Sequence, residues 1–255
     1  MIISLINLAD IPLQIVVYGI VVLLLGGFVK GTVGFAVGLV VVGGLVQVFP
    51  AKEISIILSV PFLLSNVIVL KQEDIPYRFV RGQVPFIAAL FVGVIVGVVL
   101  LRVISSQILY LLLASYIAIF LATSQNKLVA YAEKTGLSIG SGLFGGLLGG
   151  VIGVPGPPLI IHTYIQVSKK ETGFVAGVAS LFLIAHLLRI GVLASDGLLE
   201  IRGILIGIAF IIPIWVGIVL GTRFRDYIPE QRLKQIIKIF LAVIGARLAI
   251  IGFSL

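Results

Sequence analysis

Residues 145–166, GGLLGGVIGVPGPPLIIHTYIQ, contain the pattern that could best hold a small ligand. Their three prolines stop any helix between residues 154 and 158, because proline lacks a backbone donor and clashes with the preceding turn. A glycine followed by two prolines also predicts the start of a new helix. The free N–H groups and positive dipole end of such a start favour an anion. We therefore expect an anion site at Gly153, Pro155, Gly156 and Pro157.

Residues 30–38, KGTVGFAVG, form a second glycine-rich stretch, in which few side chains cover the backbone. In it we select Gly31, Thr32, Gly34 and Gly38 as candidate binding residues. Lys30 precedes them within an apolar region, and charges inside a membrane are functional by default. The alternative is a lysine at the cytoplasmic end of a span. Glycines three and four residues apart also let helices pack closely, and this alternative stays open for the glycines of both stretches.

Five further polar side chains lie within apolar runs: Ser65, Asn66, His162, His186 and Arg189. Hydroxyl and amide groups can donate to an oxyanion, and a histidine can donate or carry a proton. His186 and Arg189 are three residues apart and share a helix face. Each group has a structural alternative, which is a hydrogen bond to a neighbouring helix or, for Arg189, a side chain that reaches the membrane interface.

Two pairs of residues are candidates for gating or coupling: Gln47 with Gln166, and Glu53 with Glu171. Each pair occupies matching places in the repeat described below, which predicts that its members line two mouths or close two hairpins. The two glutamates are the best carboxylates for proton coupling. Interfacial salt bridges are the alternative.

The composition identifies the elements that must position these residues. The chain has 255 residues, of which 60% are hydrophobic and 11% charged, whereas a globular protein has about 25% charged residues. Apolar runs separated by short polar links predict an all-α polytopic integral membrane protein. We expect runs at 12–29, 32–49, 53–70, 83–101, 107–124, 138–153, 157–167, 174–194, 202–222 and 233–252.

The chain contains an internal repeat. A shift of 119 residues places the pattern GG-x-x-x-G-x-x-G of residues 26–34 on residues 145–153, and Gln47-Val48 on Gln166-Val167. Further on, Gly93 and Gly97 match Gly217 and Gly221. Glycines and polar pairs in the same order predict two homologous halves, 1–124 and 125–255, within one membrane domain.

Basic residues then predict the topology. If every run reverses the chain, one side carries twelve lysines and arginines and the other carries Lys52, Arg102 and Arg202. The positive-inside rule therefore favours five segments per half, an inverted second half, and both termini on the non-cytoplasmic side. Residues 12–49 and 138–167 are either full spans or re-entrant hairpins whose bends meet near the midplane; we prefer hairpins for the second pair and leave the first open. The net charge of +8 reflects orientation rather than nucleic-acid binding.

Several stretches together resemble a known family. GFVKGTVGFAVGLV, FPAKE, SVPFLLSN and SGLFGGLLGGVIGVPGPPLIIHTY are similar to the two signatures of the TauE/SafE sulfite-exporter family. The resemblance covers most of the chain, includes Asn66, and implies a prokaryotic inner-membrane carrier of small sulfur-containing anions such as sulfite, thiosulfate or sulfonates. Most members are described with seven to nine spans, so ten segments agree with the family if some are re-entrant.

We therefore predict a secondary carrier of a small sulfur oxyanion that works by alternating access. The anion would lie between the two bends, with Asn66 and His162 as donors and Lys30 or Arg189 supplying charge. An anion channel or aquaporin-like pore is the alternative, although Asn-Pro-Ala is absent.

Two histidines and no cysteine disfavour an enzyme. We expect no cofactor or metal; the partners are lipid, the anion and possible coupling protons. The particular anion, the direction of transport and the choice between monomer and homodimer stay open.

Overall fold

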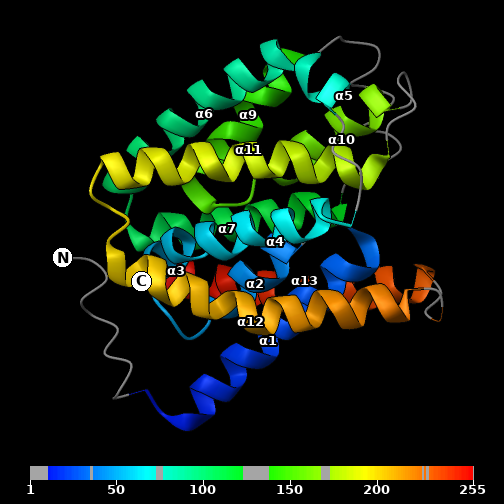
Figure 1. Ribbon diagram of the computed structural model, residues 1–255. Coiled ribbons are helices and arrows are strands. Elements are labelled where there is room, and N and C mark those ends of the chain that lie inside the picture. The colour runs from blue at the N-terminus through cyan, green and yellow to red at the C-terminus, as the bar shows by residue number, and fades with distance from the viewer. Residues whose placement is uncertain are drawn as a thin grey trace.

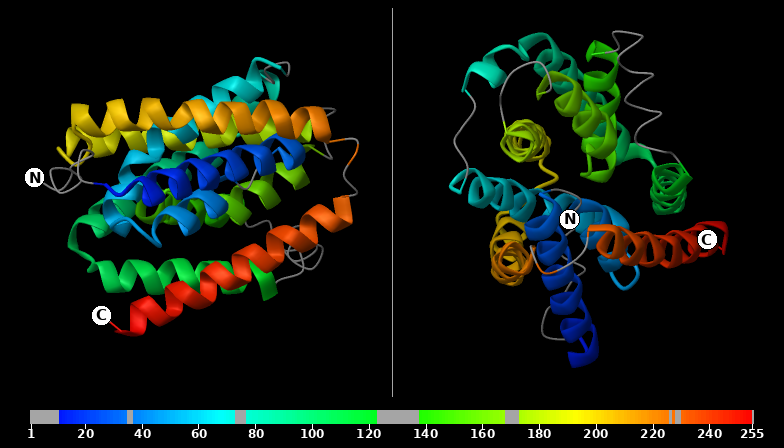
Figure 2. Two further views of the ribbon diagram at one scale, coloured as in Figure 1. Left: turned by 90° about the horizontal axis from the view of Figure 1, so that it is seen from below. Right: turned by 90° about the vertical axis from the view of Figure 1, so that its right-hand side faces the viewer.

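The computed structural model describes residues 11–34, 37–72, 77–122, 138–167, 173–225, 227 and 230–254, and every regular element in these ranges is a helix. The helices run roughly parallel to one another in a bundle (Figures 1 and 2). Their bounds are α1 Leu13–Val33, α2 Val37–Leu45, α3 Ala51–Ile57, α4 Ser59–Leu70, α5 Tyr77–Arg81, α6 Val84–Val103, α7 Ser106–Ala122, α9 Ser138–Ile152, α10 Gly156–Val167, α11 Phe174–Ser195, α12 Ile201–Phe224 and α13 Glu230–Ser254.

The described helices confirm a polytopic membrane protein. Six of them are long and apolar enough to cross a bilayer: α1, α3 with α4 (Ala51–Leu70), α6, α11, α12 and residues 235–254 of α13. Helices α7 and α9 are apolar but shorter. A span needs about 20 residues, so the short runs at 138–153 and 157–167 are the two arms α9 and α10 of one hairpin.

The helix break in the second half lies where the prolines predict it. Helix α9 ends at Ile152, Gly153 follows at φ 83°, and α10 begins at Gly156. The arms pack against each other, because a methyl group at Gly145 would overlap Leu159 and one at Gly149 would lie 3.2 Å from Pro155. The chain therefore turns back on itself within the bundle.

The break in the first half is displaced from the predicted position. We expected one run to end at residue 29, but α1 continues through Lys30 and Thr32 to Val33. Gly34 then ends the helix at φ 88°, a left-handed conformation that suits glycine, and its amide donates to the Lys30 carbonyl at 2.7 Å. Helix α2 returns along α1, where the Tyr18 hydroxyl donates to the Gly44 carbonyl at 3.0 Å.

Glycines allow two close helix crossings. Along α1, Gly27 and Gly31 meet Ile214, Ile218 and Gly221 of α12. Along α6, Gly93 and Gly97 meet Gly146 and Gly150 of α9. At each of these glycines a Cβ would collide with backbone of the facing helix. Small residues are what such membrane crossings require, so the glycine rows upstream of both breaks serve packing. In both crossings the two helices run in the same direction.

The remaining long helices complete the bundle around these crossings. Helix α4 packs on α11, and α7 packs on α13. The α7–α13 pair stands to one side of the other helices (Figure 2). Helix α2 contacts α13, and α9 contacts α7, so this pair is joined to the bundle near the two chain breaks.

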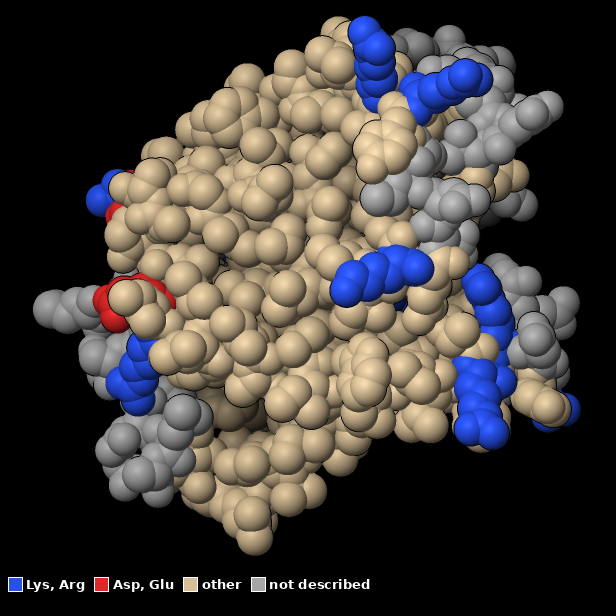
Figure 3. All heavy atoms as spheres, viewed as in Figure 1, with Lys and Arg blue, Asp and Glu red and all other residues tan. Residues whose placement is uncertain are grey.

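Charged side chains divide the described surface into two ends. Exposed Lys71, Arg78, Arg81, Arg223 and Arg225 follow or form the helix ends on one side, where Figure 3 shows basic side chains gathered. The opposite end carries Lys52, Arg202 and the Arg102–Asp196 ion pair at 2.6 Å. The start of α1 and the end of α13 lie at this second end (Figure 1).

Lys127, Lys134, Lys169 and Lys170 fall outside the described residues, and the side that faces the cytoplasm stays a prediction.

Candidate functional site

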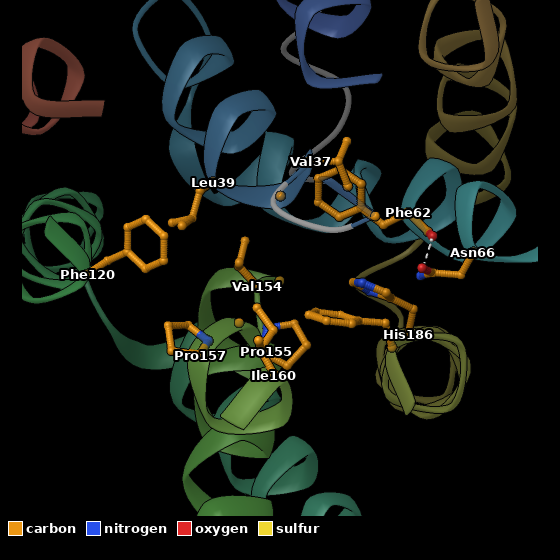
Figure 4. A pocket seen from close by; sticks show the side chains of 15 residues that line it. Val37, Leu39, Phe62, Asn66, Phe120, Val154, Pro155, Pro157, Ile160 and His186 are labelled. Atoms are coloured by element: carbon orange, nitrogen blue, oxygen red, sulfur yellow. Dashed lines mark hydrogen bonds between the residues drawn. The ribbon is translucent and has the colours of Figure 1, made fainter. Parts of the chain in front are cut away.

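The two chain breaks meet at a cavity, shown in Figure 4. The cavity is small and partly open. A Cβ at Gly38 would lie 3.0 Å from the Val154 side chain, so the two bends touch. Most of the wall is apolar, and it is formed by Val37, Leu39, Phe62, Phe120, Val154, Pro155, Pro157, Ile160 and Phe182, together with four glycines and the polar residues Asn66 and His186.

Two helices begin at this wall and two others end beside it. The first residues of α2 (Val37, Gly38) and of α10 (Gly156, Pro157) line the cavity. The N–H groups of a first helical turn have no partner within the helix, and they carry the positive end of the helix dipole. In α10, however, Pro157 and Pro158 have no N–H, and the ends of α1 and α9 bring partial negative charge to the same place. The charge that the cavity favours therefore depends on the side chains around the breaks.

Lys30 is buried rather than at the membrane surface, with 2% of its area exposed. Its Nζ donates to Asn66 Oδ1 at 2.6 Å and to Ser65 Oγ at 2.9 Å. The Asn66 amide group in turn donates to the Phe62 carbonyl at 2.9 Å. Asn66 reaches the cavity wall, and the ammonium of Lys30 lies directly behind it. The three predicted residues thus form one cluster that links α1 to α4.

Arg189 is 1% exposed and does not reach the membrane interface. Its guanidinium donates to the Ser55 carbonyl at 2.7 Å, to Ser55 Oγ at 2.8 Å and to the Gly150 carbonyl at 3.2 Å, and it also bonds Ser59 Oγ. Ser55 Oγ donates to the Ile152 carbonyl at 2.9 Å. The arginine and serine therefore cap the end of α9, where carbonyls lack helical partners.

Gly153 separates Arg189 from the cavity. A Cβ at this position would lie 2.9 Å from Arg189 Nη1. The backbone of the second break therefore passes directly over the guanidinium, which places a positive charge beneath this part of the cavity wall.

His186 is the predicted histidine that faces the cavity. It is 3% exposed and packs against Phe62, with ring centroids 5.5 Å apart. Its Nδ1 atom is buried and has no hydrogen-bond partner among the described residues. Buried polar atoms are nearly always paired, so an unpaired one beside a cavity points to a missing ligand or water.

Tyr116 of α7 carries a second unpaired polar group, and nothing in its sequence context singles it out. Its hydroxyl is buried without a hydrogen-bond partner in the described part of the chain. The hydroxyl lies against Gly156, where a side chain would overlap it. A tyrosine in an apolar run resembles any other interface aromatic, and its place beside the α10 start emerges only from the fold.

His162 lies away from the cavity. Its Nε2 is 2.7 Å from Gln83 Oε1, its Nδ1 is 3.3 Å from Ser138 Oγ, and its ring stacks on Phe86 with centroids 3.8 Å apart. This corresponds to the structural alternative considered for it, a histidine bonded to neighbouring helices. The hypothesis that His162 donates to the same anion as Asn66 gains no support from its position.

Several other predicted residues also lie outside the cavity wall. Gly31 packs on α12, and Thr32 bonds carbonyls of its own helix at 3.0 Å.

The candidates for gating or coupling also lie elsewhere. Gln47 donates to the Gly43 carbonyl at 3.1 Å, and Gln166 is half-buried near the end of α10. Glu53 is buried, and its Oε2 has no partner among the described residues. Glu171 lies outside the described residues.

The fold and cavity define a helical membrane protein with two broken hairpins around a small internal site. The sequence model described as "Sulfite exporter TauE/SafE" matches residues 19–248, so the chain belongs to this family. It is 28% identical over 240 residues to the "Probable sulfite/organosulfonate exporter TauE" of Cupriavidus necator, covering 90% of this chain and 91% of that protein. No solved structure matches the chain.

Proposed function

We propose that the protein is a secondary carrier that moves a small sulfur-containing oxyanion across the membrane by alternating access. The observation that carries the proposal is the cavity at the meeting point of two helix starts, with Asn66 and His186 in its wall. Broken helices with their positive ends directed at an anion are a recurring transporter site. Family membership and the exporter relative support sulfur anions as the substrate class.

We also propose that residues 1–124 and 125–255 are inverted repeats. The support is that repeat-matched glycines make matching contacts, Gly27 and Gly31 with α12 and Gly146 and Gly150 with α6. Helix α1 runs toward the end that carries Arg223, whereas α9 runs away from the end that carries Arg81. Two such halves can tilt against each other around a fixed central site, which is the usual basis of alternating access.

The test is transport in proteoliposomes loaded with sulfite or thiosulfate. We expect saturable uptake and counterflow, and we expect Asn66→Ala and Pro157→Ala to reduce the rate at least tenfold. Gln72→Ala, which removes an exposed amide at the end of α4, is the matched control and should transport normally.

Two results would contradict the proposal in different ways. Flux that neither saturates nor shows counterflow would identify a channel. Full transport by both site variants for every sulfur oxyanion tried would mean that the substrate binds elsewhere.

A further inference from the structure

We propose that the cavity selects an anion with two negative charges over an equally large anion with one. This inference rests on the proposed function and narrows its substrate class. The structural basis is a pair of buried cations, Lys30 of α1 and Arg189 of α11. Each cation contacts a residue of the cavity wall but does not line the cavity itself.

Neither cation has a counterion among the residues that the structure describes. The groups that accept hydrogen bonds from Lys30 are a hydroxyl and an amide oxygen, and those that accept from Arg189 are hydroxyls and backbone carbonyls. Within the described ranges, no carboxylate lies within ion-pair distance of either one; the Arg102–Asp196 pair is at the end of the bundle. The described residues therefore leave both positive charges without an ion-pair partner when the cavity is empty.

Both charges are close enough to act on the cavity. Lys30 Nζ is 2.6 Å from Asn66 Oδ1, and Asn66 lines the wall. Arg189 underlies Gly153, which also lines the wall. The ring of His186 also faces the cavity (Figure 4). An anion in the cavity would therefore lie next to residues that contact both cations.

The partial charges of the helix ends do not change the net charge around the cavity. A helix carries about +0.5 charge at its start and −0.5 at its end. Helices α2 and α10 start here, while α1 and α9 end here, so the four partial charges sum to about zero. The remaining charge is that of the two side chains, which is +2 when both are protonated.

Burial makes this charge decisive for binding. An uncompensated ion in an apolar interior is strongly unfavourable, and a paired one is much less so. A dianion neutralises both cations, whereas a monoanion leaves one of them unpaired. The unpaired His186 Nδ1 adds a neutral group in the wall, and the unpaired Tyr116 hydroxyl lies behind Gly156, which lines the cavity.

The experiment compares anions of similar size and different charge. Sulfoacetate (2−) is measured against isethionate (1−), and sulfate (2−) against methanesulfonate (1−), by thermal stabilisation and by competition for transport. We expect the better-bound dianion to bind at least tenfold more tightly than its monovalent counterpart. In Lys30→Gln, which keeps a hydrogen-bonding side chain, this preference should fall at least tenfold.

Two controls separate charge from other effects. Lys30→Arg keeps the charge and should keep the preference for the dianion. Arg102→Gln removes a positive charge at the exposed end of the bundle and should leave the preference unchanged.

The outcomes distinguish this inference from the proposed function. Equal binding of both members of a pair, or tighter binding of the monoanion, overturns the inference and leaves a sulfur-anion carrier in place. Binding of no sulfur anion by the folded wild-type protein overturns both. The comparison of dianion and monoanion binding by the wild-type protein tests the inference even if the Lys30 variants fail to fold.

Discussion

The cavity depends on single residues whose chemistry is not interchangeable. Gly153 and Gly156 have positive φ values, and each lies against a polar group, Arg189 or Tyr116. A side chain at either glycine would be strained and would displace that neighbour. The two glycines therefore bring the backbone close to groups that can act on a ligand.

The Tyr116 hydroxyl provides a prediction at this scale. A buried donor without a partner costs free energy, so Tyr116→Phe should stabilise the ligand-free protein by about 1 kcal/mol. The same change should weaken binding of the transported anion, because the hydroxyl is the unpaired donor beside the α10 start. Thermal unfolding with and without anion measures both effects.

Tyr18→Phe is the matched control, because the Tyr18 hydroxyl is already bonded to the Gly44 carbonyl at 3.0 Å. It should lower stability slightly and leave binding unchanged. Unaltered anion binding by Tyr116→Phe would show that its hydroxyl serves packing alone.

Sequence reasoning succeeded where the chemistry is local and failed where it depends on distant contacts. The break at residues 153–156 was predicted because proline and glycine act on their own backbone. The cluster around Lys30 consists of predicted site residues, whereas Ser55 and Ser59, the partners of Arg189, were not predicted. His162 and His186 could not be distinguished, since each lies in an apolar run and only packing decides which one faces the cavity.

At the scale of elements, the two crossings determine how the broken hairpins are held. Each hairpin has one arm, α1 or α9, whose glycine face packs on a helix distant in sequence. The helix type of every described apolar run was predicted correctly. The end of α1 was not, because Gly31 looks like a break in the sequence but lies within a helix whose glycine face packs on α12.

The crossings predict a clear difference between glycines. Gly217→Ala and Gly93→Ala would each place a methyl group against backbone carbonyls of the facing helix, so we expect a loss of about 1–3 kcal/mol in stability. Gly191→Ala meets no atom within 4 Å in α11 and should be neutral or stabilising. Unfolding midpoints of the three purified variants in one detergent provide the comparison.

Equal midpoints for all three variants would mean that the helices separate easily at the crossings. That result would also remove the packing explanation for the glycine rows.

At the scale of the whole molecule, the distribution of charge predicts orientation. The end with Lys71, Arg81 and Arg225 should face the cytoplasm, because basic links are retained there. The opposite end, with the start of α1 and the end of α13, should face outward. Length and hydropathy were enough to predict many spans, whereas the pairing of helices across the bundle required the structure.

The absence of native cysteine makes the orientation directly measurable. Lys71→Cys should react with a membrane-impermeant thiol reagent only after cells are opened, and Ser195→Cys should react in intact cells. Both residues are exposed at opposite ends of the described bundle. The reverse pattern would mean that the protein is inserted the other way round.

The pairing of α1 with α12 and of α6 with α9 has a consequence for synthesis. When the ribosome has made residues 1–124, the glycine faces of α1 and α6 still lack the helices that cover them. Until those helices are made, lipid or the insertion machinery must cover the glycine faces of α1 and α6 in the bilayer. The crossing of α1 is completed only when α12 arrives, and α7 still awaits α13 after that. A truncation anywhere before residue 201 should therefore leave a chain that quality-control proteases recognise.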